Sequence, residues 1–254
     1  MSGLPDDFWE TLPLAAGVRL LTRDANGLAA FDKPHGVLSH PNSSQDEPRS
    51  LLTSRYDKTA QCFVWKAADG SDRRLWLLNR LDSATSGVIL TAASEKLATT
   101  IREHYAKKQV NKTYQALTFG KPHKGSGSDL WQDMLAVKKT QGQIRAATIG
   151  NVPAVTKFKL IKYSQKAFST SLIRLEPRTG RSHQLRVQCA KRQSPIIGDQ
   201  TYGDFPLNRA FAKATGNKRL FLHSLETSFT YDLGGKAHAF KATAPLPPEF
   251  LAEY

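Results

Sequence analysis

The chain has 254 residues, of which 40% are apolar and 23% charged, so it can bury a hydrophobic core and is not disordered by composition. Its apolar runs fall far short of the ~18 residues of a membrane helix, and its two cysteines exclude a disulfide framework or a four-cysteine zinc site. The start carries Asp6, Asp7 and Glu10 where a signal peptide would be positive, so we expect a soluble, cytoplasmic protein.

Positive charge is concentrated in the middle of the chain. Residues 101–200 hold 19 basic and 5 acidic side chains, whereas residues 1–100 hold 11 and 12, and residues 201–254 hold 6 and 5. A field of this sign concentrates polyanions and speeds their encounter. The distribution favours contact with nucleic acid, with a solvated basic face as the alternative.

The first hundred residues predict strands joined by turns. Strands at 18–21 and 28–31 flank a hairpin turn, strands at 62–67 and 75–78 flank another, and 88–92 forms a buried strand. Pro48 is predicted to open a helix that carries Leu51, Leu52, Arg55 and Tyr56 at helical spacing.

The rest of the chain predicts single helices among strands. Ser94 caps a helix with Leu97, Ile101 and Tyr105 on its apolar stripe. A flexible loop is expected at 120–130, and further helices after Arg181 and over 207–215. Strands are expected at 112–119, 144–149, 155–163, 168–175, 220–223, 227–231 and 237–241. This order indicates an α+β fold with a mixed, mostly antiparallel sheet.

One polar loop lies between two apolar strands over residues 78–90. It contains Asp82, with Arg80 two residues earlier. Such a loop presents a carboxylate at a sheet edge beside a guanidinium. Spacing alone leaves open the alternative that Asp82 only caps backbone N–H groups of a turn.

A glycine-containing turn leads into a helix over residues 176–187. Arg178, Arg181 and Arg186 lie within it, and helix N-termini and guanidinium groups favour anions, either phosphates or a carboxylate. The alternative is a solvated first turn with Leu185 and Cys189 facing the core.

The strand at 110–116 places Lys112 and Tyr114 on one face, because strand side chains alternate. A lone tyrosine on a strand is more often a core or sheet-surface residue than a functional one.

The sequence contains no recognisable motif for binding a cofactor or a metal. The glycines at 125 and 127 have no third glycine and no strand–loop–helix context, so they form neither a dinucleotide fingerprint nor a P-loop. The seven histidines are scattered, and Ser86 is not in a Gly-x-Ser-x-Gly elbow. We therefore expect no cofactor and no metal.

Together these segments resemble the RluA-type family of RNA pseudouridine synthases. The matching segments are residues 32–36 with His40, 79–87, 112–116, 179–186 and 195–204, in the family's order. Two departures are Asn79, where members usually carry His, and Asp32, where they often carry Asn. Both departures bear on how the loop before Asp82 is held, or on which RNA is accepted.

The resemblance covers about residues 17–245. It implies a single catalytic domain over 1–254, with no separate N-terminal RNA-binding domain, as in the family's short members. The implied architecture is the pseudouridine synthase catalytic fold, with flanking helices and a central RNA-binding cleft.

The implied reaction converts a uridine in structured RNA to pseudouridine, with base flipping and no cofactor. By resemblance, Asp82 is the catalytic carboxylate, whether as nucleophile, stabiliser or base. Arg181 pairs with it, which keeps a buried carboxylate ionised. Tyr114 stacks on the target base and assists proton removal at C5.

Four further residues are expected to bind substrate. Leu185 lines the uracil pocket, and Arg80 fills the gap left by the flipped base. Lys112 and Arg186 complete the set, and lysines of the middle segment contact phosphates without specifying sequence. Those lysines are at positions 107, 108, 112, 121, 124, 138 and 139.

The expected partner is RNA, with tRNA first and ribosomal RNA second. A monomer without obligatory protein partner or membrane is expected. Two rival functions stay open: a catalytically inactive RNA-binding module on the same fold, and a hydrolase that uses Asp82 with His183 or His223.

Overall fold

The computed structural model describes residues 7–122, 129–140 and 143–252, and within strands it leaves out the side chains of 137–149. The chain divides into two compact units. Unit 1 comprises residues 1–110 and 226–244, and unit 2 comprises residues 111–225 and 245–254. Most of the predicted loop at 120–130 lies outside the described residues.

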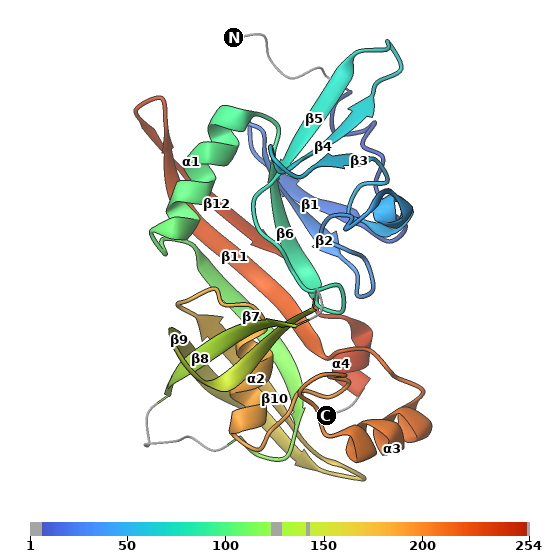
Figure 1. The fold of residues 1–254 in the computed structure, drawn as a ribbon, viewed down its shortest axis with the longest axis vertical. Helices are drawn as coiled ribbons and strands as arrows, with labels where there is room; N and C mark the ends of the chain where they lie inside the picture. Colours follow the sequence, from blue (N-terminus) through green and yellow to red (C-terminus); the bar gives the residue numbers. More distant parts are fainter. Residues whose placement is uncertain (1–6, 123–128, 141–142, 253–254) are drawn as a thin grey trace. The chain divides into compact units, whose positions relative to one another are not determined.

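Unit 1 contains mostly antiparallel strands of a 12-stranded sheet and one flanking α-helix (Figure 1). Its strands are ordered β3-β4-β5-β6-β11, with β2 pairing β6 and β1, and β12 pairing β11. The elements are β1 (Arg19–Arg23), β2 (Leu28–Lys33), the 3₁₀ helix η1 (Ser44–Arg49), β3 (Arg55–Asp57), β4 (Cys62–Lys66), β5 (Asp72–Leu77), β6 (Ser86–Ala92), α1 (Glu95–Ala106), β11 (Leu222–Leu233, whose first residues belong to unit 2) and β12 (Lys236–Thr243).

The first hairpin and the first helix form as the sequence predicts. The Asp24 carboxylate accepts the backbone N–H groups of Asn26 and Leu28, which closes the β1–β2 turn. The Ser94 hydroxyl accepts from the Leu97 N–H and caps α1.

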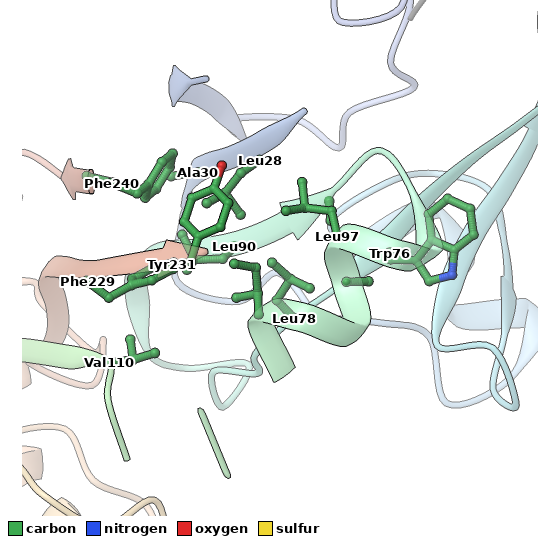
Figure 2. Close-up of a cluster of buried hydrophobic side chains, with 14 of the residues drawn as sticks. Leu28, Ala30, Trp76, Leu78, Leu90, Leu97, Val110, Phe229, Tyr231 and Phe240 are labelled. Atoms are coloured by element: carbon green, nitrogen blue, oxygen red, sulfur yellow. The ribbon is translucent and has the colours of Figure 1, made fainter. Parts of the chain in front are cut away.

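The core of unit 1 lies between its sheet and α1. Figure 2 shows Leu78, Leu90 and Leu97 grouped with the aromatic rings of Phe229 and Tyr231. Every residue of β2 and β6 is buried, which explains why these strands have no polar face in the sequence. The buried strands therefore fix the positions of Lys33, the last residue of β2, and of Ser86, the first residue of β6.

The strands of unit 2 continue the same 12-stranded sheet in the order β11-β7-β10-β9-β8, and α2 contacts β8 and β9. Figure 1 shows the longest strands of unit 2 in green to yellow. The elements are β7 (Asn111–Phe119), β8 (Leu130–Thr140), β9 (Gln143–Gln165), β10 (Ser169–Pro177), α2 (Gln184–Lys191), α3 (Phe205–Thr215) and α4 (Pro248–Ala252). The Phe211 ring of α3 packs against Phe119, Phe168 and Phe221.

The structure confirms the α+β class and corrects several elements. The helix predicted after Pro48 is wrong: η1 ends at Arg49, and Tyr56 lies in β3 opposite Phe63 of β4. Pairing with a neighbouring strand here overrides an apolar spacing that also fits a helix.

Two pairs of predicted strands are each one long strand. Residues 144–149 and 155–163 both belong to β9, with an irregularity opposite Leu135 and Ala136, and the strands predicted at 220–223 and 227–231 merge in β11. Strand β8 was not predicted. A Cβ at Gly150 would come within 2.1 Å of the Ala136 nitrogen, so glycine permits the close approach at this irregularity.

Among the described residues, no helix is long and apolar enough to cross a membrane. The described part of the chain also contains no group of three His, Cys, Asp or Glu side chains that could hold a metal ion.

Candidate active site

Asp82 lies in a tight turn between β5 and β6 of unit 1. The Thr85 N–H donates to the Asp82 carbonyl at 2.9 Å, and the Asp82 side chain is partly exposed. The neighbouring Leu81 is buried, and so are Thr85 and Ser86. The turn is thus anchored on both sides of a carboxylate that reaches the surface.

A fully buried lysine holds this turn from β2. Lys33 has no exposed surface, and its Nζ donates to the carbonyls of Val37 at 2.7 Å, Ser83 at 3.1 Å and Pro34 at 3.1 Å. The Gly36 N–H also donates to the Ser83 carbonyl at 2.7 Å. A buried ammonium is costly unless its donors are satisfied, so the backbone around Asp82 is fixed by these contacts.

Ser39 fixes the residue just before Asp82. Its Oγ donates to the Leu81 carbonyl at 2.7 Å and accepts from the Leu81 N–H at 2.9 Å. One buried hydroxyl therefore satisfies both backbone groups of a loop residue that has no ladder partner.

The two departures from the family pattern have local partners. Asn79 Oδ1 accepts from the Leu90 N–H at 2.7 Å, so it ties the loop to β6. Asp32 pairs with Arg19 of β1 at 3.2 Å. Asn79 thus helps to hold the loop before Asp82, while Asp32 ties β2 to β1.

Arg80 projects from the same loop, and its side chain is exposed. Its charge acts on Tyr56 of β3. Burial raises the pKa of Tyr56 to about 12, against the lowering effect of the Arg102 and Arg80 guanidinium groups.

In unit 2, Arg181 lies in the turn that leads into α2. Its N–H donates to Gln184 Oε1 at 3.1 Å, and its Nε donates to the Pro153 carbonyl at 3.3 Å. His183 ends this turn in the left-handed conformation, with φ of 55°, and its Nδ1 lies 2.9 Å from the Tyr202 hydroxyl. Strained backbone of this kind persists only where surrounding contacts fix it.

A buried chain of side-chain amides and hydroxyls attaches α2 to the sheet. Gln184 Oε1 accepts from the Thr179 hydroxyl, and its Nε2 donates to Thr156 Oγ1. Thr156 donates to Gln188 Oε1 at 2.6 Å, and Gln188 Nε2 donates to Asp133 at 2.8 Å. Satisfied buried networks of this kind specify a single arrangement, here that of the Arg181 turn on β9.

Arg186 is committed to a buried ion pair. Its Nε and Nη2 donate to the two oxygens of Asp199 at 2.7 and 2.8 Å, and only 1% of the Asp199 side chain is exposed. Asp199 also accepts the N–H groups of Thr201 and Tyr202. This geometry gives Arg186 a positioning role for the loop that reaches His183 through Tyr202.

Leu185 lies on the same helix, one residue before Arg186, and is almost fully buried. Its expected contact with uracil stays a prediction.

Tyr114 and Lys112 lie on β7, with Tyr114 opposite Leu175 of β10 and partly exposed. Burial lowers the pKa of Lys112. A Cβ on Gly180 would lie 3.8 Å from the Lys112 Nζ, so this ammonium lies beside the Arg181 turn.

The structure thus groups the predicted residues by unit. Asp82 and Arg80 share the loop of unit 1, whereas Tyr114, Lys112 and Arg181 belong to unit 2. The pairing of Asp82 with Arg181 joins the two units and stays a prediction.

The sequence interpretation missed the side chains that hold these turns. Lys33, Ser39, Gln184 and Tyr202 all lie inside or beside the quoted motifs, but no role was assigned to them. For Lys33 the available signal was a charged residue at the end of a strand that begins with four apolar residues.

A protein-family model, described as RNA pseudouridylate synthase, matches residues 27–191, well over half of the chain. The chain belongs to the RNA pseudouridylate synthase family. As a member of it, the protein is an isomerase that acts on RNA.

Curated relatives agree with this membership. The chain is 32% identical to tRNA pseudouridine synthase C of Haemophilus ducreyi, over 84% of this chain and 85% of the relative. It is 30% identical to the dual-specificity RNA pseudouridine synthase RluA of Escherichia coli, over 85% and 89% of the two chains.

Solved structures show the same fold. The human RNA pseudouridylate synthase domain containing 4 superposes with a TM-score of 0.62 at 22% identity, over 91% of this chain and 90% of that one. The human domain containing 1 gives 0.61 at 19% identity, over 92% and 86%. The expected pseudouridine synthase fold is confirmed.

Proposed function

We propose that this protein converts a uridine of tRNA to pseudouridine, with Asp82 as its essential carboxylate. The observation that carries the proposal is the turn of Asp82, fixed by Lys33 and Ser39 in a chain of this family. tRNA is favoured over ribosomal RNA because several similar relatives are named tRNA pseudouridine synthase C.

The reaction is an isomerisation. The N1–C1′ bond of the uridine breaks, uracil rotates, the C5–C1′ bond forms, and the proton at C5 is lost while N1 gains one. Asp82 acts on C1′ or the sugar in its ionised form. Because burial disfavours a charged carboxylate, we propose that the Arg181 guanidinium pairs with Asp82 when the target nucleotide is bound.

The other predicted residues receive roles around that carboxylate. Tyr114 stacks on the target base and assists proton removal at C5, and Leu185 lines the uracil pocket. Arg80 fills the gap left by the flipped base, which its exposure at the Asp82 loop allows.

The remaining contacts are electrostatic. Lys112 binds a phosphate beside the Arg181 turn, and Arg186 supports that turn through Asp199. We further propose that the protein acts as a cytoplasmic monomer, because its RNA substrate class is found there and no step needs a second subunit.

The test is tritium release from tRNA that carries 5-tritiated uridine. Asp82→Asn should lower the rate by more than about 10³-fold, at the upper end of what a single acid–base or nucleophilic group contributes, while tRNA binding stays within about twofold. Asp69→Asn, which removes a carboxylate from another exposed turn of unit 1, is the matched control and should keep the wild-type rate.

Full activity of Asp82→Asn would refute the assignment. Loss of RNA mass, or release of free uracil, would show hydrolysis instead, since isomerisation leaves the mass of the RNA unchanged.

A further inference from the structure

Two aromatic rings stack beside the Asp82 loop. The rings of His40 and Tyr56 lie 4.9 Å apart with only 12° between their planes, and both side chains are partly exposed. The Tyr56 ring is supported by the buried Phe63, whose ring meets it edge to face at 4.9 Å. The stack is therefore an aromatic surface that rests on the buried Phe63 on one side and is partly exposed to solvent.

Backbone contacts place this stack next to the reacting loop. His40 follows Ser39, whose hydroxyl is bonded in both directions to Leu81, and Leu81 lies between Arg80 and Asp82. The Arg80 charge also acts on the Tyr56 hydroxyl. The stack and Arg80 thus share one neighbourhood within unit 1.

We propose that the His40–Tyr56 stack is a binding surface for a nucleobase adjacent to the target uridine. The inference rests on the proposed function and adds a specificity site to it. Bases of splayed or single-stranded RNA stack on aromatic side chains, and cationic groups nearby hold the backbone. Arg80 is such a cation, and Lys58 follows Tyr56 by two residues with its side chain exposed.

A second stack in unit 1 shows what a purely structural pair looks like. His238 stacks on Tyr231 at 5.3 Å, but Tyr231 is 1% exposed and its hydroxyl is bonded to Asp24 and Asn26 at the first hairpin. That tyrosine is held by the core and the hairpin. Tyr56 is instead partly exposed, and the Arg80 charge acts on it.

The experiment measures coupling between the stack and single bases. A tRNA transcript that the wild-type protein binds is prepared with one abasic residue at a time, at successive positions along the transcript. Affinities are measured by fluorescence anisotropy for wild type, His40→Leu and Tyr56→Leu. One abasic position should weaken wild-type binding about tenfold and binding of either variant by less than about twofold.

His238→Leu is the matched control and should keep the wild-type response to that abasic position. His40→Phe, which keeps a ring, should restore it. Equal abasic penalties in wild type, His40→Leu and Tyr56→Leu would overturn the proposal. Thermal unfolding of each variant separates a lost stack from a lost fold, because coupling to one base position does not follow from general destabilisation.

Pseudouridine in the same transcript is measured after incubation with wild type. Its absence would refute the proposed function, whereas coupling that persists without it would still support the stacking surface.

Discussion

The two units of the chain are similar in length but differ in net charge. Unit 1 holds 16 basic and 15 acidic side chains, whereas unit 2 holds 20 basic and 7 acidic. The carboxylate proposed to act on the sugar lies in the balanced unit, and the groups proposed to hold RNA lie mainly in the basic one. A field that attracts phosphates thus comes mainly from a different unit than the one that carries the reacting anion.

The units also hold their key turns in different ways. In unit 1 a buried ammonium and a hydroxyl bind backbone groups around Asp82. In unit 2 side-chain amides and a buried ion pair support the turn of Arg181. The first depends on a few main-chain contacts, and the second on a polar network through the core.

The largest loss of stability is expected from breaking the ion pair of unit 2. Arg186→Met leaves Asp199 buried without its guanidinium partner and should lower the free energy of unfolding by about 3–5 kcal/mol. Denaturant unfolding checks this. Arg174→Met removes a half-exposed arginine paired with Glu176 and should cost less than about 1 kcal/mol. Equal losses of unfolding free energy in Arg186→Met and Arg174→Met would show that burial of the Arg186–Asp199 pair does not increase its contribution.

The Lys33 contacts that hold the Asp82 turn should contribute less to stability than the Arg186–Asp199 pair, but their loss should lower the catalytic rate. Lys33→Met keeps the apolar stem but removes the ammonium donor from three part-buried carbonyls, of which only that of Ser83 keeps another donor among the described residues, so we expect a loss on the order of 3 kcal/mol. Tritium release should fall by more than unfolding accounts for, because the Asp82 turn loosens. Lys66→Met, at an exposed pair with Asp72, serves as control. An unchanged rate in Lys33→Met would show that catalysis does not need the hydrogen bonds of the Lys33 ammonium around Asp82.

Acid should weaken unit 2 through its buried carboxylates. Desolvation raises the pKa of Asp199, but the Arg186 hydrogen bonds and charge outweigh it and hold the pKa below its usual value; Lys191, Gln188 and Arg192 do the same for Asp133. A folded pKa below the unfolded one gives stability that is present above about pH 4 and lost as the pH falls through the folded value.

Melting of wild type and Asp199→Asn from pH 7 to pH 3 checks this sign. The gap between their midpoints should be constant above about pH 5 and narrow below about pH 4. A gap that widens in acid would contradict the lowered pKa.

The smallest expected effect concerns a single phosphate contact. Lys112→Met should weaken tRNA binding a few-fold at low salt and reduce the slope of log affinity against log salt by about one. Lys66→Met in unit 1 should leave the slope unchanged. Filter binding over a salt series measures both, and an unaltered slope in Lys112→Met would exclude this phosphate contact.

Local sequence determined the elements whose signals act over short range. The Asp24 turn and the Ser94 cap form from neighbouring residues, and the apolar strand of β6 could only be a buried one. The motifs around Asp82 and Arg181 likewise identified the family. The local elements and the family motifs both depend on residue types at fixed spacing, which can be read directly from the sequence.

Tertiary structure decided what depends on distant partners. Pairing of Tyr56 with Phe63 turned a helical pattern into a strand, and the ammonium of Lys33 found its acceptor at Ser83, fifty residues away. The His40–Tyr56 stack arose in the same way. Spacing along the chain carries no record of such contacts, because the free energy that selects them comes from burial and hydrogen bonding between segments that meet only in the folded protein.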